Sequence, residues 1–365
     1  MKKVLVLSNM YPSATSKTFG IFVENQVKAL KGRGLEVDVL AITNTNNSKA
    51  ALVKKYIQWG LKTLWNVVTK GKSYDVVHAH YVFPTGVLGL LYKKLLKKRL
   101  IVTAHGGDID RMSKKNPLIK KWTNYILHES DAIIAVGQEL QRSIHEEFHL
   151  PLEKISIINM GVNRDVFFPI EKQLARKKCQ IPTDEIPLLF VGNLIEQKGI
   201  LELLDAFDQV KKLFPNVSLY IMGTKKSEAF FEKITSLSKD IGNIKILDAK
   251  PQTEVAVWMS AAEIFVLPSH LEGFGLVALE AMSCHTPVVG SKVGGLTYLL
   301  QDGAGVLVEP KDSLSLYDGI IHLLQNKNNA TSIVQAGEIQ ADKNDERKMI
   351  NEVLNLYGLS TQKSQ

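Results

Sequence analysis

The sequence has 365 residues, of which 45% are hydrophobic and 22% are charged, a composition that fits a globular protein of two domains and excludes a disordered chain. The net charge of +8 is uneven, with 25 basic and 13 acidic residues in 1–170 but 20 basic and 24 acidic residues in 171–365. A basic half fits an anionic membrane or an acidic small substrate better than nucleic acid, because no nucleic-acid recognition motif accompanies the charge.

The first predicted element is a β-strand at residues 3–8. The apolar run behind the N-terminal lysines spans only 4–7, which is too short for a signal peptide. No apolar stretch approaches the ~18 residues that a membrane-spanning helix needs. Two cysteines, Cys179 and Cys284, give no disulfide framework and no cysteine metal cluster. We therefore expect a protein of the reducing cytoplasm.

The second notable element is a predicted helix at 52–72, one of three basic clusters with 92–100 and 111–122. It has no acidic residue, and apolar side chains recur in it at helical spacing: Tyr56, Ile57, Leu61, Leu64, Trp65 and Val68. Such a helix can lie on a membrane interface with its lysines toward anionic lipid. It can equally be an amphipathic helix packed on a sheet. The sequence leaves both interpretations open.

Short β-branched runs alternate with helix-length segments along the whole chain. Strands are predicted at 3–8, 35–42, 74–80, 99–104, 131–136, 155–158, 187–192, 217–222, 243–247, 263–267, 286–289 and 305–308. This alternation predicts parallel sheets covered by helices. Twelve strands are too many for one compact sheet, so we divide them six and six.

The break between the two sets lies at 161–187, where the periodicity fails and prolines and charges gather. We predict an α/β protein of two Rossmann-like domains, 1–168 and 169–341. The last predicted helix, 342–357, carries an apolar face that needs a partner, and the segment 342–365 is assigned to the first domain. Two such domains suggest a cleft, with ligand at the carboxyl ends of the strands.

The segment 268–295, PSHLEGFGLVALEAMSCHTPVVGSKVGG, carries the most chemistry. A strand leads through a loop into a helix predicted to begin near Gly273-Phe274-Gly275, and the unpaired N–H groups there suit a diphosphate. Glu280 falls roughly two turns into that helix, about 9 Å along its axis. This distance from the phosphate end fits a ribose, whose hydroxyls can donate hydrogen bonds to a carboxylate. Glu272 stays on the loop beside the phosphate end.

The spacing E-x7-E from Glu272 to Glu280, with GFG inside it and GG at 294–295, resembles glycosyltransferase family four, which has the GT-B fold. Other segments resemble that family's blocks in the same order: FGIFVENQVKAL (19–30), DVVHAHYVFPTG (75–86), VTAHGGDI (102–109), INMGVNRDVFFP (158–169) and VGNLIEQKGILELLDAF (191–207). The resemblance covers nearly the whole chain. Within the family the sequence resembles bacterial cell-surface polysaccharide enzymes of the teichuronic acid type.

The resemblance implies two Rossmann-like domains facing across a cleft, with the C-terminal helix returning to the first. It implies transfer of a hexosyl group from a nucleotide-diphosphate sugar, with retention of configuration and with no metal or other cofactor. A UDP-sugar is favoured by family frequency alone. The acceptor is a glycan or a lipid-linked glycan, and the helix at 52–72 favours the lipid-linked one at the inner face of the cell membrane.

The donor-site residues follow from the resemblance position by position. Lys198 matches the cation that neutralises the donor diphosphate, where leaving-group charge develops. Glu272 is assigned to hydroxyls of the donor sugar and Glu280 to the ribose. The backbone of Gly273, Phe274 and Gly275 completes the predicted donor site.

The sequence departs from the family pattern at two places in this site. Asn193 stands where the family commonly has arginine, so either a neighbour such as Lys292 supplies the second cation or phosphate binding is weaker. Gly294-Gly295 is followed by Leu296-Thr297-Tyr298 rather than Pro-Glu, so a contact near the donor sugar is expected to differ.

The first domain contributes five further candidates. His105 matches the family histidine that faces the donor sugar, and Gly20 matches the glycine that lets the backbone approach the diphosphate. Asp108 can hydrogen-bond an acceptor hydroxyl or cap the next helix. Tyr11 and Tyr81 are weaker candidate acceptor contacts.

Three other motifs could be read as a metal site or a nucleophile, but the sequence supports these readings less well than the donor site. Asp108-Ile109-Asp110 reads as D-x-D, a metal-binding signature of the other large glycosyltransferase fold. His78 and His80 share one strand face, but no carboxylate cluster completes a metal site, so we expect a buried pair. Cys284 is expected to be a buried thiol rather than a nucleophile.

Two alternatives to a transferase remain open. A nucleotide-sugar epimerase, or another isomerase or phosphorylase, can use the same scaffold, because a fold does not fix a reaction. A catalytically silent partner subunit is the other, and Asn193 is its only support. A dehydrogenase is excluded because no G-x-G-x-x-G follows the first strand.

Overall fold

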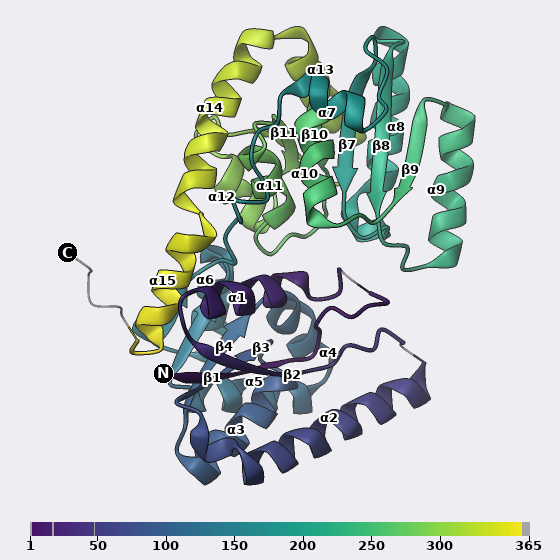
Figure 1. Ribbon diagram of the computed structural model, residues 1–365. Coiled ribbons are helices and arrows are strands. Elements are labelled where there is room, and N and C mark those ends of the chain that lie inside the picture. The colour runs from purple at the N-terminus through teal and green to yellow at the C-terminus, as the bar shows by residue number, and fades with distance from the viewer. Residues whose placement is uncertain (1, 17, 47, 360–365) are drawn as a thin grey trace, which may run out of the picture. The chain divides into compact units, whose positions relative to one another are not determined.

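The computed structural model describes residues 2–16, 18–46 and 48–359, and the chain forms two compact units (Figure 1). The first comprises Met1–Met160 with Glu346–Gln365, and the second comprises Gly161–Asp345. The sequence divided the chain at 168/169 and 341/342. Residues 360–365 of the predicted returning segment lie outside the described part.

The first unit is a six-stranded parallel sheet covered by helices. Its strands follow the order β2-β1-β3-β4-β5-β6, and all neighbouring pairs run parallel. The elements are β1 (Lys3–Ser8), α1 (Ile21–Gly32), β2 (Glu36–Ala41), α2 (Lys49–Thr69), β3 (Val76–His80), α3 (Thr85–Leu96), β4 (Arg99–Ala104), α4 (Ser113–Lys115), α5 (Pro117–Glu129), β5 (Ala132–Ala135), α6 (Gln138–Phe148), β6 (Ile155–Ile157) and α15 (Glu346–Leu356). Single helical turns lie at Gly71–Ser73, Asp108–Met112 and Leu152–Lys154.

The second unit repeats this plan, with strand order β12-β11-β10-β7-β8-β9 and parallel pairing throughout. Its elements are α7 (Lys172–Lys178), β7 (Ile186–Val191), a turn at Glu196–Lys198, α8 (Ile200–Leu213), β8 (Val217–Gly223), α9 (Glu228–Ile241), β9 (Ile244–Asp248), α10 (Gln252–Ala261), β10 (Ile264–Leu267), α11 (Leu276–Ser283), β11 (Val288–Ser291), α12 (Gly294–Leu300), β12 (Val306–Val308), α13 (Ser313–Gln325) and α14 (Lys327–Lys343). The predicted division into two six-stranded parallel sheets is confirmed.

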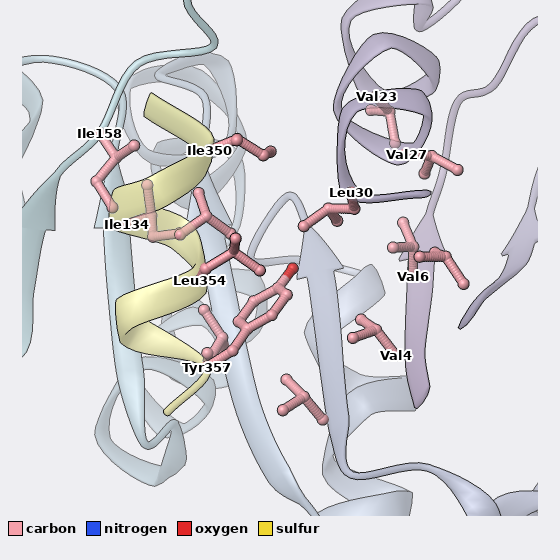
Figure 2. Close-up of a cluster of buried hydrophobic side chains, with 14 of the residues drawn as sticks. Val4, Val6, Val23, Val27, Leu30, Ile134, Ile158, Ile350, Leu354 and Tyr357 are labelled. Carbon is pink, nitrogen blue, oxygen red and sulfur yellow. The ribbon is translucent and has the colours of Figure 1, made fainter. Parts of the chain in front are cut away.

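The returning helix α15 packs into the core of the first unit. Its Ile350, Val353, Leu354 and Tyr357, the last just past the helix end, are buried with Val4 and Val6 of β1, Val23, Val27 and Leu30 of α1, and Ile134 of β5 (Figure 2). The apolar face predicted for the last helix therefore has its partner. Figure 2 shows the Tyr357 ring directed toward the strands of the sheet.

The last helix is shorter than predicted, and this prediction needs correction. The apolar pattern predicted one helix over 342–357, but α14 ends at Lys343 and α15 begins at Glu346. The carbonyl of Asn344 accepts the N–H of Val162 (2.9 Å), and the Asn344 side chain donates to the Gln340 carbonyl (2.8 Å). These bonds hold the chain between the helices in a non-helical path. A short helix, α7, also lies within the irregular break predicted at 161–187.

Helix α2 packs against the first unit through one face and exposes its more apolar face to solvent. Its buried residues are Lys55, Trp59, Thr63 and Val67, at four-residue spacing. Trp59 donates its ring N–H to the carbonyl of Leu40 in β2 (3.0 Å). The helix therefore does pack on the sheet, as one of the two interpretations expected, but most of the apolar face read from the sequence is exposed.

Within residues 2–16, 18–46 and 48–359, no helix has the length and apolar character needed to cross a membrane.

Candidate functional site

The predicted donor-site residues gather where strand order reverses in the second unit. Strand β7 is the first of its sheet, and the chain adds β8 and β9 on one side before β10 pairs on the other. Lys198 follows β7 and Glu272 follows β10, so both lie at the carboxyl ends of adjacent strands. Ligands of open parallel sheets bind at such a point.

Lys198 and Glu272 form an ion pair. The Lys198 Nζ lies 2.5 Å from Glu272 Oε2, and the buried Ser269 hydroxyl donates to the same oxygen at 3.1 Å. Both charged side chains are mostly buried, with 20% and 17% of their surface exposed. The pairing places the predicted phosphate cation and the predicted sugar-binding carboxylate at one point.

Gly199 fixes the turn that carries Lys198. Its φ of +69° lies in the left-handed region, and a Cβ there would stand 1.9 Å from the carbonyl oxygen of Pro268. The same two segments share a backbone hydrogen bond, because the N–H of His270 donates to the carbonyl of Gln197 (3.0 Å). The Lys198 turn and the Glu272 loop are therefore held against each other through their backbones. Gly199 was not among the predicted site residues, although a glycine directly after the predicted lysine could have indicated this turn.

Helix α11 begins later than the sequence suggested. Gly275 precedes its first residue, Leu276, with a φ of +90°. Glu280 is the fifth residue of the helix, about 7.5 Å along the axis from Gly275 rather than two turns from the start. Gly295 must also be glycine, because its Cβ would stand 2.3 Å from the Cα of Phe274. The glycines thus allow close backbone packing around Phe274, which is itself buried.

Glu280 is buried, and burial raises its pKa to about 8. The side-chain amide of Gln252, on α10, donates to Glu280 Oε1 at a long 3.4 Å. At neutral pH the free protein therefore holds Glu280 mostly as the neutral acid. A buried carboxyl with so weak a partner is suited to receiving donors from a ligand. No sequence pattern pointed to Gln252.

The two positions that depart from the family pattern lie near the same strand ends. Asn193 follows β7 and is exposed, and its carbonyl accepts the N–H of Ile195 (2.9 Å). Lys292 follows β11, with its Nζ 3.9 Å from Glu309 and an exposed side chain. Tyr298 lies on α12 and is half-buried.

In the first unit Gly20, Tyr81 and His105 lie at the carboxyl ends of strands around the β1/β3 switch point. Gly20 precedes α1 with a φ of +73°, and a Cβ there would stand 2.6 Å from the Met10 carbonyl oxygen. Tyr81 also has a positive φ (71°), and its hydroxyl donates to Met10 Sδ at 3.3 Å. Non-glycine residues are rarely held in this region, and such strain clusters at functional sites.

Three histidines form a stacked column that ends at His105. The rings of His78 and His80 stack with centroids 4.4 Å apart, and those of His80 and His105 with centroids 5.4 Å apart. His78 Nδ1 lies 2.6 Å from the hydroxyl of Tyr357, and His80 Nδ1 lies 3.2 Å from His105 Nε2. Burial lowers the pKa of both His78 and His105 to about 3, so all three rings are neutral at physiological pH. The predicted buried histidine pair is confirmed, whereas its link to His105 and to the returning helix was missed.

The aromatic rings of Phe22 and Tyr81 lie against His105, with centroids 4.9 and 4.6 Å from it. Tyr11 is half-buried, and burial raises its pKa. The sequence did not single out Phe22, although it lies two residues after Gly20. The histidine ring is thus held between aromatic neighbours.

Asp108 is buried, and each of its carboxylate oxygens accepts a backbone N–H, one from Val82 (2.8 Å) and one from His105 (3.0 Å). Burial raises its pKa to about 6. Neither of these two donors belongs to the turn at Asp108–Met112. Asp108 instead ties the loop after β3 to the loop after β4.

No group of three or more metal-ligating side chains occurs among the described residues. Cys284 is buried, and burial raises the pKa of its thiol to about 12, as expected of a buried thiol.

Two Rossmann-like units, each with its candidate residues at the carboxyl ends of a parallel sheet, are the architecture of GT-B glycosyltransferases. Solved structures agree with this fold. A sucrose-phosphate synthase from Thermosynechococcus elongatus superposes with a TM-score of 0.83 at 21% identity, covering 98% of each chain. The HepE protein of Anabaena, solved in complex with UDP and glucose, superposes with a TM-score of 0.80 at 18% identity, covering 98% of this chain and all of that one.

Sequence comparison gives the family. The family described as glycosyltransferase family 4 matches residues 20–166, and the family described as glycosyl transferases group 1 matches residues 171–340. An uncharacterized glycosyltransferase of Methanocaldococcus jannaschii is 30% identical over 97% of both chains. A putative teichuronic acid biosynthesis glycosyltransferase of Bacillus subtilis, TuaC, is 24% identical over 87% of this chain and 88% of its own. The chain belongs to this family of glycosyltransferases.

Proposed function

We propose that the protein transfers a hexosyl group from a nucleotide-diphosphate sugar, a UDP-sugar in preference, to an acceptor in cell-surface polysaccharide or glycoconjugate synthesis. The transfer retains the anomeric configuration and uses no metal. The observation that carries the proposal is the meeting of Lys198, Glu272 and the start of α11 at the switch point of the second sheet.

The start of α11 and Lys198 bind the diphosphate. In the free protein Lys198 is neutralised by Glu272 (2.5 Å), so an incoming phosphate competes with that carboxylate for the same ammonium group. Once the phosphate takes the ammonium, Glu272 can accept hydrogen bonds from hydroxyls of the donor sugar. A cation preorganised at the leaving phosphate stabilises the charge that develops there and lowers the barrier to transfer. It supplies the positive charge that a metal ion supplies in other transferases.

Glu280 binds the ribose of the donor. Its carboxyl group is buried with one long hydrogen bond, so hydroxyl donors from a ribose improve its hydrogen bonding. Hydrogen bonds to the charged form favour ionisation, so donor binding is expected to lower the pKa of Glu280 and release a proton.

His105 is proposed to face the donor sugar, with Gly20 providing the close backbone approach to the diphosphate. Stacking on His80 and packing against Phe22 and Tyr81 fix the orientation of the His105 ring. The neutral ring can donate one hydrogen bond to a sugar oxygen without placing a charge in the site. The proposed acceptor contacts are Tyr11, Tyr81 and Asp108.

Relatives support the choice of donor and pathway. HepE was solved with UDP and with glucose, and TuaC is described as a teichuronic acid biosynthesis enzyme. A lipid-linked acceptor is proposed because the segment 52–72 combines lysines with exposed apolar side chains. The proposed place of action is the inner face of the cell membrane.

The test is a panel of UDP-, GDP- and ADP-sugars incubated with the purified protein in EDTA, with nucleotide release followed by mass spectrometry. Lys198→Ala and Glu280→Ala run beside Lys250→Ala, which removes a partly exposed lysine paired with Glu254 in the same unit. We expect slow release from one donor by the wild type and by Lys250→Ala, and loss in the two site variants. Nuclear magnetic resonance of the product then reads the anomeric configuration.

Other outcomes count against the proposal in distinct ways. Release that requires a divalent ion contradicts metal independence. A mass-neutral change of the nucleotide sugar indicates an epimerase. No release, together with no donor-dependent rise in melting temperature, indicates a silent partner subunit.

A further inference from the structure

Helix α2 exposes a continuous apolar stripe. The stripe consists of Val53, Ile57, Leu61, Leu64, Trp65 and Val68, which recur every three or four residues and so lie along one face of the helix. Trp65 is 72% exposed and Val68 is 82% exposed. Figure 1 shows α2 on the outside of the first unit. Single exposed apolar residues are ordinary on a protein surface, but a row of six is typical of an interaction site.

The inward face of α2 explains why the stripe stays outside. Lys55 is buried there and donates to the carbonyls of Asn44 and Asn46 at 3.2 and 3.1 Å. Thr63 is buried as well, with its hydroxyl bonded to the Trp59 carbonyl (2.9 Å). Turning the helix to bury the stripe would expose Trp59 and break the bonds of Lys55 to the loop before the helix, whereas the Thr63 bond lies within the helix and would be kept. The helix is therefore held with its more apolar face toward solvent.

The surroundings of the stripe are basic. Lys54 and Lys62 are exposed on α2 beside it, and neither has an ion pair within the described part of the chain. Asp75 is the one acidic residue in the whole sequence segment 39–107. In the neighbouring basic segments Lys93, Lys94 and Lys120 are paired with Asp131, Glu129 and Glu147, so the charge beside the stripe comes chiefly from the lysines of α2.

We propose that the outer face of α2 docks on an anionic lipid bilayer, with the apolar stripe in the headgroup region and the lysines toward lipid phosphates. Apolar burial and charge attraction act together on such a surface. A second copy of the chain fits less well, because two lysine-bearing faces would repel each other. The role of this docking, access to a lipid-linked acceptor, rests on the proposed function. The docking itself needs no transferase activity.

The test is co-sedimentation of the full chain with vesicles of phosphatidylcholine alone or mixed with phosphatidylglycerol. We expect binding to the anionic vesicles only, weakened by salt. Leu61→Ser with Trp65→Ser is expected to reduce partitioning by about tenfold or more, since two exposed apolar groups are lost. Lys54→Glu with Lys62→Glu is expected to reduce it by about tenfold or more through the charge.

Leu213→Ser with Ile339→Ser is the matched control, because both residues are exposed to the same degree in the second unit. This variant should bind vesicles like the wild type. Trp65 also reports directly: its emission should shift to the blue on anionic vesicles, and Trp65→Phe should lose that shift while still sedimenting with them.

Several results would overturn the proposal. The first is an absence of wild-type binding to anionic vesicles, and the second is an equal loss of binding in the control variant. The third is a wild type that self-associates and does not bind vesicles, and that Leu61→Ser with Trp65→Ser converts to a monomer. Nucleotide release from a free UDP-sugar should be unchanged in the α2 variants. A failure of docking is thereby separated from a failure of the transferase assignment, which would abolish release but leave vesicle binding intact.

Discussion

At the scale of single residues, the charges of the proposed donor site are neutralised within the protein. Lys198 is paired with Glu272, and Glu280 is held largely as the neutral acid by burial. The E-x7-E spacing singled out Glu272 and Glu280, and the family resemblance singled out Lys198. The sequence could not show that Lys198 and Glu272 touch, since 73 residues separate them in the chain and the contact depends on β7 pairing with β10.

The Lys198–Glu272 pair should contribute more to stability than an exposed pair. In a double-mutant cycle with alanine at both positions, we expect a coupling energy of about 0.5–3 kcal/mol, because removal of one partner leaves the other charge mostly buried. The Lys250–Glu254 pair, whose side chains are 32% and 54% exposed, should give only about 0.3–0.5 kcal/mol. Urea unfolding of the seven proteins, the wild type and three variants for each pair, measures both values. Equal couplings would show that the pair at the switch point is no more than a surface contact.

Glu280 should make stability depend on pH. Its folded-state pKa of about 8 lies above the ordinary 4.5, so the folded protein keeps a proton that the unfolded chain releases between these values. The stabilisation is fully present below about pH 4.5 and is lost as the pH rises to about 8, by up to about 1.4 kcal/mol per pH unit.

Glu280→Gln removes this titration, so we expect the variant to be more stable than the wild type at about pH 8 and to bind donor more weakly. The exposed Glu254→Gln should change neither property. Urea unfolding across this pH range checks the first expectation and a nucleotide titration checks the second. A variant with the same pH dependence as the wild type would rule out Glu280 as the buried acid.

At the scale of elements, all twelve strands were predictable because a β-branched run between turn signals is a local pattern. The orientation of α2 was not predictable. Its inward face is chosen by contacts of Trp59 and Lys55 with the β2 end and the loop after it, which periodicity alone does not reveal. The break between α14 and α15 was missed for a similar reason, since it depends on the bond from Val162 to Asn344. Tertiary hydrogen bonds decided each of these points.

The turn between β7 and α8 should tolerate only glycine at position 199. Gly199→Ala places a Cβ against the Pro268 carbonyl, whereas Gly303→Ala has a similar φ (+78°) and open space around it. Gly303→Ala should cost about 1–2 kcal/mol of unfolding free energy, from the left-handed backbone alone. Gly199→Ala should cost more and also weaken UDP binding, because the Lys198 turn must move. Thermal unfolding and a UDP titration compare the two, and equal effects would contradict the packing argument.

At the scale of the whole molecule, the chain crosses twice between its units, at 160–161 and 345–346, and its last helix completes the core of the first unit. This return was partly predictable, because the apolar face of the last helix had no partner in its own sequence neighbourhood. Through Tyr357 the helix also reaches the histidine column that ends at His105. The sequence could not show this link, since Tyr357 and His78 lie 279 residues apart.

Weakening α15 should therefore destabilise the first unit. Leu354→Ala removes a side chain that is 2% exposed and should cost about 2–5 kcal/mol, whereas the exposed neighbour Asn355→Ala should cost little. Hydrogen exchange should show lost protection in β1 and β3 but not in β7 and β8. Uniform loss across all four strands would indicate that the two units unfold as one.

The most direct test of the account is calorimetric titration of UDP into the protein in EDTA. The account predicts binding by the wild type and by Lys250→Ala, severe weakening in Lys198→Ala and Glu280→Ala, and release of a proton from Glu280 on binding, seen as a dependence of the heat on buffer ionisation. Binding that needs a divalent ion, or that survives in Glu280→Ala, would contradict the donor site described for the second unit.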